Sequence, residues 1–116
     1  MIFTHEKFEA YQMSIQFVEI ALKLIDKLPP GHSVLRDQLK RAAFSVPLNI
    51  AEGTGKNGTA DRLKFYSIAR GSAMDCAAIC DIISFVDTSL LAETKNGKQK
   101  LLSIVNILST VCLKQN

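Results

Sequence analysis

The feature that most constrains the fold is a helical repeat of polar residues between positions 9 and 28. Polar side chains recur there at spacings of three and four, which places them on one stripe of a helix. The remaining positions are apolar and divide into two seams. One seam holds Phe8, Tyr11, Ile15, Val18, Leu22 and Ile25, and the other holds Ala10, Met13, Phe17, Ile20 and Leu24. A surface helix of a monomer needs only one apolar stripe, so the second seam predicts a second packing partner.

Residues 29–31, Pro-Pro-Gly, end this first helix, because a proline restricts the residue before it and has no backbone N–H to donate. A second helix follows, with Ser33 as its N-cap and Gly53 just after its last turn. Its apolar residues keep the helical spacing on both sides of Pro47. Since a proline removes the hydrogen bond to the carbonyl of Ala43, we expect a kink at Pro47 rather than a break.

Two further helices are predicted in the C-terminal half. Residues 54–58 form a tight connection, after which Thr59 caps a helix that extends to about Val86. Residues 87–100 are polar and contain Asn96-Gly97, a pair typical of loops, so the start of the last helix stays open. Beyond that segment the apolar spacing is helical again.

The composition favours an all-α fold. Six glycines and three prolines are too few for the turns of a many-stranded β protein. Four helices with short connections predict an antiparallel up-down four-helix bundle that forms one domain, residues 1–116. The helices are expected at about 6–28, 34–53, 59–86 and 93–114. Wide apolar faces on the first and third helices predict assembly as a cyclic homo-oligomer; the alternative is that a small bundle buries both flanks without a partner.

The sequence also predicts a location. No apolar run approaches the roughly 20 residues that a membrane-spanning helix requires, and residues 1–6 carry neither a basic segment nor a following apolar block, so we expect no secretory signal. Cys76 and Cys80 lie four apart in an apolar helical pattern, where cysteine packs as a small hydrophobic residue. Three cysteines cannot all pair with one another, which fits a reducing compartment. We therefore expect a cytoplasmic protein that makes no contact with a membrane.

The net charge of +3 conceals a local excess of basic residues. Residues 36–70 hold seven Lys or Arg and three acidic residues, whereas residues 1–35 and 71–116 are close to balance. Six basic residues on adjacent helices are candidates for contacts with phosphates: Lys40, Arg41, Lys56, Arg62, Lys64 and Arg70. Repeated around an oligomer, they would form a basic belt. The alternative is that they are ordinary solvated charges.

No catalytic, metal or cofactor site is predicted. Residues 53–58 match the pattern G-x-G-x-x-G, but a helix precedes them instead of the strand that a dinucleotide-binding fold requires. We expect a glycine cap and a turn there, although the amides that begin the third helix, beside Lys56 and Arg62, leave a phosphate site open. His5 and His32 have neither a cluster of metal ligands nor a nucleophile to activate. We therefore expect a protein that is not an enzyme.

Residues 40–53 read Lys-Arg-Ala-Ala-Phe-Ser-Val-Pro-Leu-Asn-Ile-Ala-Glu-Gly. This stretch resembles the signature R-R-A-x-x-S-[IV]-P-x-N-I-A-E-G of the four-helix-bundle proteins encoded within intervening sequences of bacterial 23S ribosomal RNA genes. Ala10-Tyr11-Gln12 is similar to an aromatic-Gln pair of that family, and Ala69-Arg70-Gly71-Ser72 is similar to its A-x-G-S. The likeness covers roughly residues 6–110.

The chain departs from the family pattern at two positions. Lys40 replaces the first arginine, which weakens a bidentate role there, and Asp75 stands where the family tends to have Glu. The resemblance implies a bundle that assembles as a homopentamer with a central pore, and it marks eight structural positions: Ser45, Pro47, Asn49, Glu52, Gly53, Gly71, Ser72 and Asp75. The architecture is also similar to the accessory protein of diversity-generating retroelements, which binds nucleic acid and a reverse transcriptase.

The motif also has a physical account. The polar groups of Asn49 and Glu52 on the interior of a helix must find hydrogen-bond partners. Ser45 and Ser72 are small enough for close helix contact and able to hydrogen-bond. We therefore expect a buried polar network, which at a subunit boundary would set the register; its members are Asn49, Glu52, Arg41 and Ser72 or Asp75.

Together these observations favour a non-enzymatic, oligomeric bundle whose basic surface binds RNA or DNA without a cofactor. The alternative is a purely protein-binding assembly module whose charges only confer solubility. A protein partner other than a second copy of the chain is compatible with both hypotheses.

Overall fold

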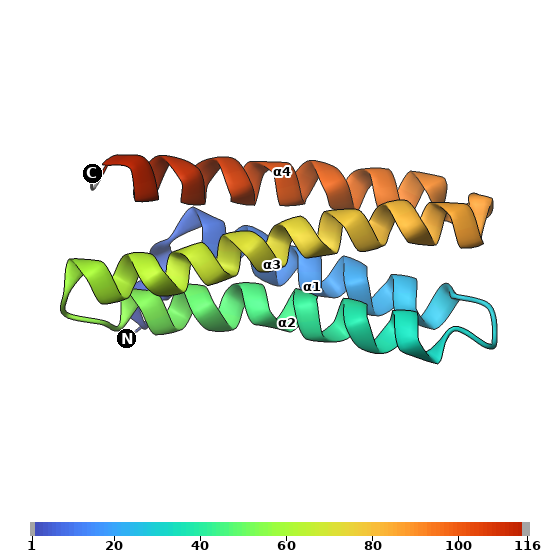
Figure 1. Cartoon of the computed structure of the whole chain (residues 1–116), viewed down its shortest axis with the longest axis horizontal. Coiled ribbons are helices and arrows are strands. Elements are labelled where there is room, and N and C mark those ends of the chain that lie inside the picture. The colour runs from blue at the N-terminus through green and yellow to red at the C-terminus, as the bar shows by residue number, and fades with distance from the viewer. Residues whose placement is uncertain (1, 115–116) are drawn as a thin grey trace.

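The computed structural model describes residues 2–114 of the chain. These residues form four α-helices and no strand: α1 (Glu9–Lys27), α2 (Ser33–Thr54), α3 (Thr59–Val86) and α4 (Leu91–Lys114). Two short 3-10 helices, η1 (Thr4–Lys7) and η2 (Thr88–Leu90), precede α1 and α4. Successive α-helices run in opposite directions along the 45 Å long axis (Figure 1). The predicted all-α fold with four helices is confirmed.

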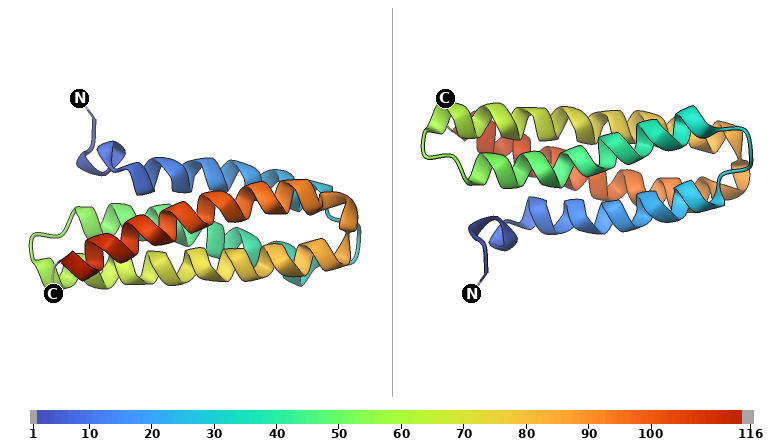
Figure 2. Two further views of the ribbon diagram at one scale, coloured as in Figure 1. Left: turned by 90° about the horizontal axis from the view of Figure 1, so that it is seen from above. Right: turned by 90° about the horizontal axis from the view of Figure 1, so that it is seen from below.

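The helices form a closed ring in which each packs on two neighbours. α1 and α3 each contact both α2 and α4, and Figure 2 shows α4 on one side of the bundle and α2 on the other. The 3-10 helix η1, the connection between α2 and α3, and the last turns of α4 all lie at the same end of the bundle (Figure 1). Segments far apart in the sequence therefore meet at that end.

The two predicted seams of α1 lie in different surroundings. Ala10, Phe17 and Leu24 of one seam are buried in the core at 0–1% exposure. In the other seam, Ile15 keeps 46% of its surface exposed and Leu22 keeps 41%. The protomer therefore covers the seam of Ala10, Phe17 and Leu24 more completely than the other, although Met13 and Ile20 of that seam are only half-buried.

The first α-helix begins at Glu9, whereas the sequence predicted a start at about residue 6. Phe8 adopts an extended conformation with φ −79° and ψ 122°, which separates η1 from α1. The ring of Phe8 packs 5.6 Å from the ring of Tyr66 on α3. Burial of this aromatic pair stabilises the interruption of the helix.

The predicted N-caps, Ser33 and Thr59, are each the first helical residue instead. The N-caps are His32 and Gly58, and neither side chain hydrogen-bonds to the first turn. A capping hydroxyl must sit on a residue with non-helical backbone to reach the free amides, and Ser33 and Thr59 already lie within the helices. The prediction was wrong by one residue at both positions.

Arg36 holds the connection between α1 and α2. Its Nη2 donates to the carbonyl oxygens of Leu28 and Pro29, both at 2.7 Å, and its Nε donates to the carbonyl of Ile25 at 3.3 Å. Carbonyls at a helix C-terminus lack partners within the helix, so a half-buried guanidinium satisfies them here. This explains why one of the seven basic residues in the positive segment is not available as a surface charge.

Gly53, predicted to end the second helix, and Gly97, part of a pair read as typical of loops, both lie inside helices. α2 continues past Gly53 to Thr54, and α4 runs without interruption through the Asn96-Gly97 pair. A Cβ atom on Gly53 would lie 2.9 Å from the ring of Tyr66, and one on Gly97 would lie 3.1 Å from the ring of Phe17. Both glycines allow an aromatic ring of a neighbouring helix to approach the backbone, a tertiary requirement that outweighs their low helix propensity.

Helix α2 is continuous through Pro47, which is buried. A break into two halves is therefore excluded. The kink expected at Pro47 stays a prediction.

Candidate functional site

The motif of residues 40–53 occupies the middle of α2 and packs against α3. Its buried residues face the core: Ala43, Val46, Pro47, Ile50 and Gly53. At the edge of this contact, the hydroxyls of Ser45 and Ser72 share a hydrogen bond of 2.8 Å. The amide Nδ2 of Asn49 donates to the backbone carbonyl of Ser45 at 2.8 Å and to its Oγ at 2.9 Å. The predicted contact between the two serines is confirmed, and Asn49 orients it.

The polar network is smaller than predicted. Glu52 points to solvent and pairs with Lys56 at 3.1 Å, and Arg41 and Asp75 are exposed. In water an i,i+4 ion pair satisfies the Glu52 carboxylate without the cost of burying its charge. Arg41 and Asp75 instead line a groove of about 470 Å³ between α2 and α3, with Ser45 and Ser72 among its other lining residues.

The six predicted basic residues fall into three places. Lys40 and Arg41 lie on the exposed face of α2, and the Nζ of Lys40 sits 5.8 Å from the ring centre of Phe44. Arg70 lies between α3 and α4, where its Nε donates to the hydroxyl of Ser109 at 2.6 Å. Arg70 is therefore partly committed to packing the protomer.

The other three basic residues gather at the end of the bundle where α2 connects to α3. Lys56 and Lys64 stand over the same ring of Phe65, with Nζ atoms 5.3 Å and 5.9 Å from its centre. Arg62 donates from Nη2 to the carbonyl of Lys56 at 3.0 Å, which holds the connection against α3. Two cations over one aromatic ring combine positive charge with an aromatic surface, a combination also found in proteins that bind single-stranded nucleic acids.

The outer face of α3 carries a row of exposed residues, most of them apolar. They follow a spacing of three and four and are all exposed: Ile68, Gly71, Asp75, Ala78, Ile82 and Phe85, which we call the outer stripe of α3. Phe85 is 90% exposed, Ile82 49% and Ile68 42%. This periodicity was readable in the sequence, but periodicity does not tell which face of a helix its own protomer buries.

The exposed apolar residues do not amount to a membrane span. Among residues 2–114, no helix combines the length and the apolar character that crossing a bilayer requires. The exposed apolar residues lie on helices that also carry charged residues.

The predicted packing of the cysteines is confirmed. Cys76 and Cys80 are fully buried in the core, and burial raises the pKa of the Cys76 thiol to about 12 and that of Cys80 to about 11. A thiol that resists ionisation is a poor nucleophile and a poor metal ligand. Within the described part of the chain, no group of three or more His, Cys, Asp or Glu side chains is arranged to hold a metal ion.

The glycine-rich stretch 53–58 has no dinucleotide-binding context. A helix precedes it, Gly53 is buried inside that helix, and Gly55 is the C-cap with φ −78°. Arg62 fastens the connection through the carbonyl of Lys56. The stretch therefore serves as a turn between α2 and α3, close to the predicted glycine cap and turn.

The fold and the surface together define a small four-helix-bundle protein with exposed apolar residues on several helices. Residues 6–110 match the family profile described as 23S rRNA-intervening sequence protein, and the chain belongs to this family. The family resemblance read from residues 40–53 is thereby confirmed.

One solved structure shares the fold over almost the whole chain. It is described as a protein with unknown function from the S23 ribosomal protein family of Bacteroides thetaiotaomicron. It superposes with a TM-score of 0.82 and 17% sequence identity, covering 89% of this chain and 97% of that one. At this identity the likeness shows the fold alone. No curated protein matches the chain.

Proposed function

We propose that the protein is a non-enzymatic scaffold that assembles from copies of itself in the cytoplasm and binds RNA or DNA. The outer stripe of α3 carries the first part of this proposal. A monomer gains nothing from leaving Phe85 90% exposed and Ile82 49% exposed, and exposed apolar surface of this kind marks interaction sites. The expected assembly is a cyclic homo-oligomer, and the family resemblance implies a pentamer.

Gly71, in the middle of the outer stripe, supports close contact between copies. A Cβ atom at Gly71 would meet nothing within 4 Å in the protomer. Glycine inside a helix costs about 1 kcal/mol relative to alanine, so packing within the protomer does not explain it. An approaching helix of a second copy does, because glycine lets two backbones come close.

The test of assembly is the mass in solution, measured by light scattering. We expect a mass that is a multiple of the 12.8 kDa of one chain, and five times that mass for a pentamer. The double substitution Ile82→Lys and Phe85→Lys adds charge to the outer stripe and is expected to lower the mass. Leu102→Lys is the matched control, because Leu102 is 61% exposed on α4 and lies outside the stripe. A monomeric wild-type protein would contradict the proposal.

The second part, binding of nucleic acid, is supported by the basic residues near Phe65 and Phe44. Lys56, Lys64 and Lys40 each lie within 6 Å of a ring centre, and repetition around a ring of subunits would multiply their charge. Phosphate neutralisation by such residues makes binding fall steeply with salt. Arg62 and Arg70 hold parts of the protomer together, so reversing their charge would disturb the protomer as well as the basic surface.

We therefore expect the substitutions Lys40→Glu, Lys56→Glu and Lys64→Glu, made together, to abolish binding of a structured RNA or a DNA duplex in fluorescence anisotropy. The control triple Lys23→Glu, Lys27→Glu and Lys95→Glu makes the same change of charge at exposed lysines of α1 and α4. Retained binding by the first triple would contradict the assignment of these residues. No binding by the wild type at physiological salt would favour the alternative, an assembly module whose charges only confer solubility.

A further inference from the structure

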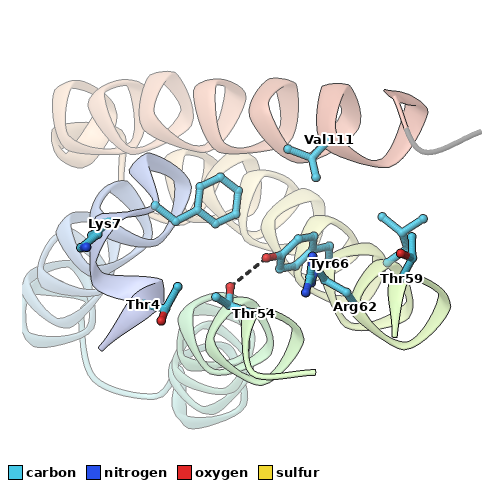
Figure 3. A pocket seen from close by; sticks show the side chains of 9 residues that line it. Thr4, Lys7, Thr54, Thr59, Arg62, Tyr66 and Val111 are labelled. Carbon is cyan, nitrogen blue, oxygen red and sulfur yellow. Dashed lines mark hydrogen bonds between the residues drawn. The ribbon is translucent and has the colours of Figure 1, made fainter. Parts of the chain in front are cut away.

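A pocket with a cavity volume of about 400 Å³ opens at the end of the bundle where η1, α2, α3 and α4 meet. Four elements supply its nine lining residues, so the sequence gives no local sign of it: Thr4, Lys7, Phe8, Thr54, Thr59, Arg62, Leu63, Tyr66 and Val111. Figure 3 shows Tyr66 and Arg62 side by side on α3, facing Thr54 of α2, with Val111 of α4 above them. A volume of this size lies within the range of small-molecule sites.

The charge of the pocket has one sign. Lys7 and Arg62 are cationic, and none of the nine lining residues is acidic. The Nε of Arg62 is enclosed by protein and has no hydrogen-bond partner, although the Nη2 of the same guanidinium donates to the carbonyl of Lys56. Because the Nε is enclosed, a ligand meets Arg62 through the part of the side chain that lines the pocket, where Arg62 and Lys7 supply positive charge with no acidic residue in the lining.

The hydroxyl groups of Thr54 and Tyr66 form a pair beside Arg62. Thr54 donates its only hydroxyl hydrogen to the carbonyl of Ile50 at 2.9 Å, so in the 2.8 Å contact between Thr54 and Tyr66 the phenol is the donor. Both hydroxyl hydrogens are thus engaged within the protein. The pair holds the ring of Tyr66 as a fixed wall of the pocket beside Arg62.

Four of the nine lining residues supply apolar or aromatic surface. Phe8, Leu63 and Val111 are half-buried, and Tyr66 is 5% exposed with its ring 5.6 Å from that of Phe8. The lining contains no sulfur, imidazole or carboxylate group that would hold a metal ion. An uncharged apolar ligand would leave the two cationic lining residues, Lys7 and Arg62, without a counter-charge.

We propose that this pocket binds a small organic anion, in which a phosphate or carboxylate group meets Arg62 and an attached apolar or aromatic group packs against Phe8, Leu63 and Tyr66. A guanidinium and an oxyanion form strong, geometrically matched hydrogen bonds. This site is separate from the outer stripe of α3 and does not depend on the proposed scaffold function.

The experiment uses phenyl phosphate as the probe, with the whole chain, by isothermal titration and by the methyl NMR signals of Leu63 and Val111. Inorganic phosphate carries the charged half of the probe and phenol the apolar half, and benzoate replaces the phosphate by a carboxylate. We expect phenyl phosphate, benzoate or both to bind and to shift the two methyl signals. Inorganic phosphate and phenol are each expected to bind at least about tenfold more weakly than the better of these two ligands, because each lacks one half of the interaction.

Two variants test the site from opposite sides. Arg62→Lys keeps the charge but removes the planar guanidinium that matches an oxyanion, and we expect binding to weaken about tenfold to a hundredfold. Val111→Phe fills the cavity without changing any charge and is expected to abolish binding. Arg70→Lys is the control, because Arg70 lies on the same helix and does not line the pocket.

The proposal is overturned if neither phenyl phosphate nor benzoate shifts the Leu63 and Val111 signals, or if Val111→Phe, shown to be folded by circular dichroism, binds as tightly as the wild type. Equal weakening by Arg62→Lys and Arg70→Lys would also overturn it, since a substitution outside the pocket would then affect binding as much as one in its wall. Failure of the nucleic-acid test leaves these outcomes unaffected, so the two proposals fail separately.

Discussion

The inner and outer faces of α3 both carry apolar residues, but the inner face is buried in the core and the outer face is exposed. Ala69, Ala73 and Ile83 on the inner face are completely buried, whereas Ile82 and Phe85 on the outer face are 49% and 90% exposed. Ile82 and Ile83 are adjacent in the sequence, and about 100° of rotation around the helix separates their side chains. Hydrophobicity by itself therefore does not reveal which residues stabilise the protomer.

The residue types on the two faces indicate different uses. Small side chains dominate the centre of the inner face, where α2 and α4 pack closely on α3, and Ser72 bonds to Ser45 at the edge of that contact. The outer face combines Gly71 and Ala78 with larger residues that have nothing to pack against in the protomer. The inner face explains the fold of one chain, and the outer face supports the proposal that chains assemble.

Truncating the two adjacent isoleucines one at a time tests whether the inner and outer faces of α3 contribute differently to stability. Ile83→Ala leaves a cavity in the core, so we expect the free energy of unfolding to fall by about 2–5 kcal/mol. Ile82→Ala is expected to change the unfolding of the isolated protomer by about 0.5 kcal/mol or less. Urea denaturation followed by circular dichroism measures both.

The protein concentration separates the two roles further. Loss of a contact between copies makes apparent stability depend on concentration, so Ile82→Ala is expected to destabilise only at concentrations where the wild type is assembled. Equal, concentration-independent losses for Ile82→Ala and Ile83→Ala would show that the outer face serves the protomer after all.

A smaller effect with the opposite sign is expected at Gly71. Gly71→Ala replaces a helix-interior glycine where a Cβ atom meets nothing within the protomer, so the protomer should gain about 1 kcal/mol. The same methyl group would obstruct the approach of a second copy, so the assembly should weaken. Thermal unfolding of dilute protein and light scattering of concentrated protein measure the two parts. The contact proposed for Gly71 fails if the assembly is as tight in the variant as in the wild type.

The smallest expected effect comes from the buried thiols of the inner face. Burial raises the pKa of Cys76 to about 12 and of Cys80 to about 11, from 9.0 for an unperturbed thiol. Their contribution is fully present below pH 9 and is lost as the pH rises through that range, because the unfolded chain ionises first. At pH 9 the loss is about 0.4 kcal/mol for each thiol.

The pH effect is measured by comparing the melting temperature at pH 7 and pH 9 with that of the variant Cys76→Ala/Cys80→Ala. The variant is expected to lose less stability between the two pH values. An identical loss would assign the pH dependence to other groups.

Much of the fold was predictable from local patterns. The spacing of apolar residues, the Pro-Pro-Gly stretch at 29–31 and the scarcity of glycine were sufficient for four helices and no strand. The errors occurred where a local rule met a tertiary contact. Gly53 and Gly97 are helix breakers by propensity, but each allows the close approach of an aromatic ring. The assignment of Asn49 to a polar network was correct, since it bonds to Ser45. The assignment of Glu52 was wrong, because Lys56 one turn later gives its carboxylate a partner in water.

The candidate sites show the same limit. The sequence located the basic residues but not their neighbours, and so it grouped Arg62 and Arg70 with Lys64 although both arginines are engaged within the protomer. The pocket at the end of the bundle had no sequence signal, since residues from Thr4 to Val111 line it and only the antiparallel packing brings them together.

By itself, the sequence determined the helical class, the number of helices and the family, because periodicity and a contiguous motif are properties of neighbouring residues. Only the tertiary structure decided which apolar faces are buried, which polar groups find partners and where a cavity remains. Those outcomes depend on how four helices rotate and pack against one another, which no single stretch of the chain specifies.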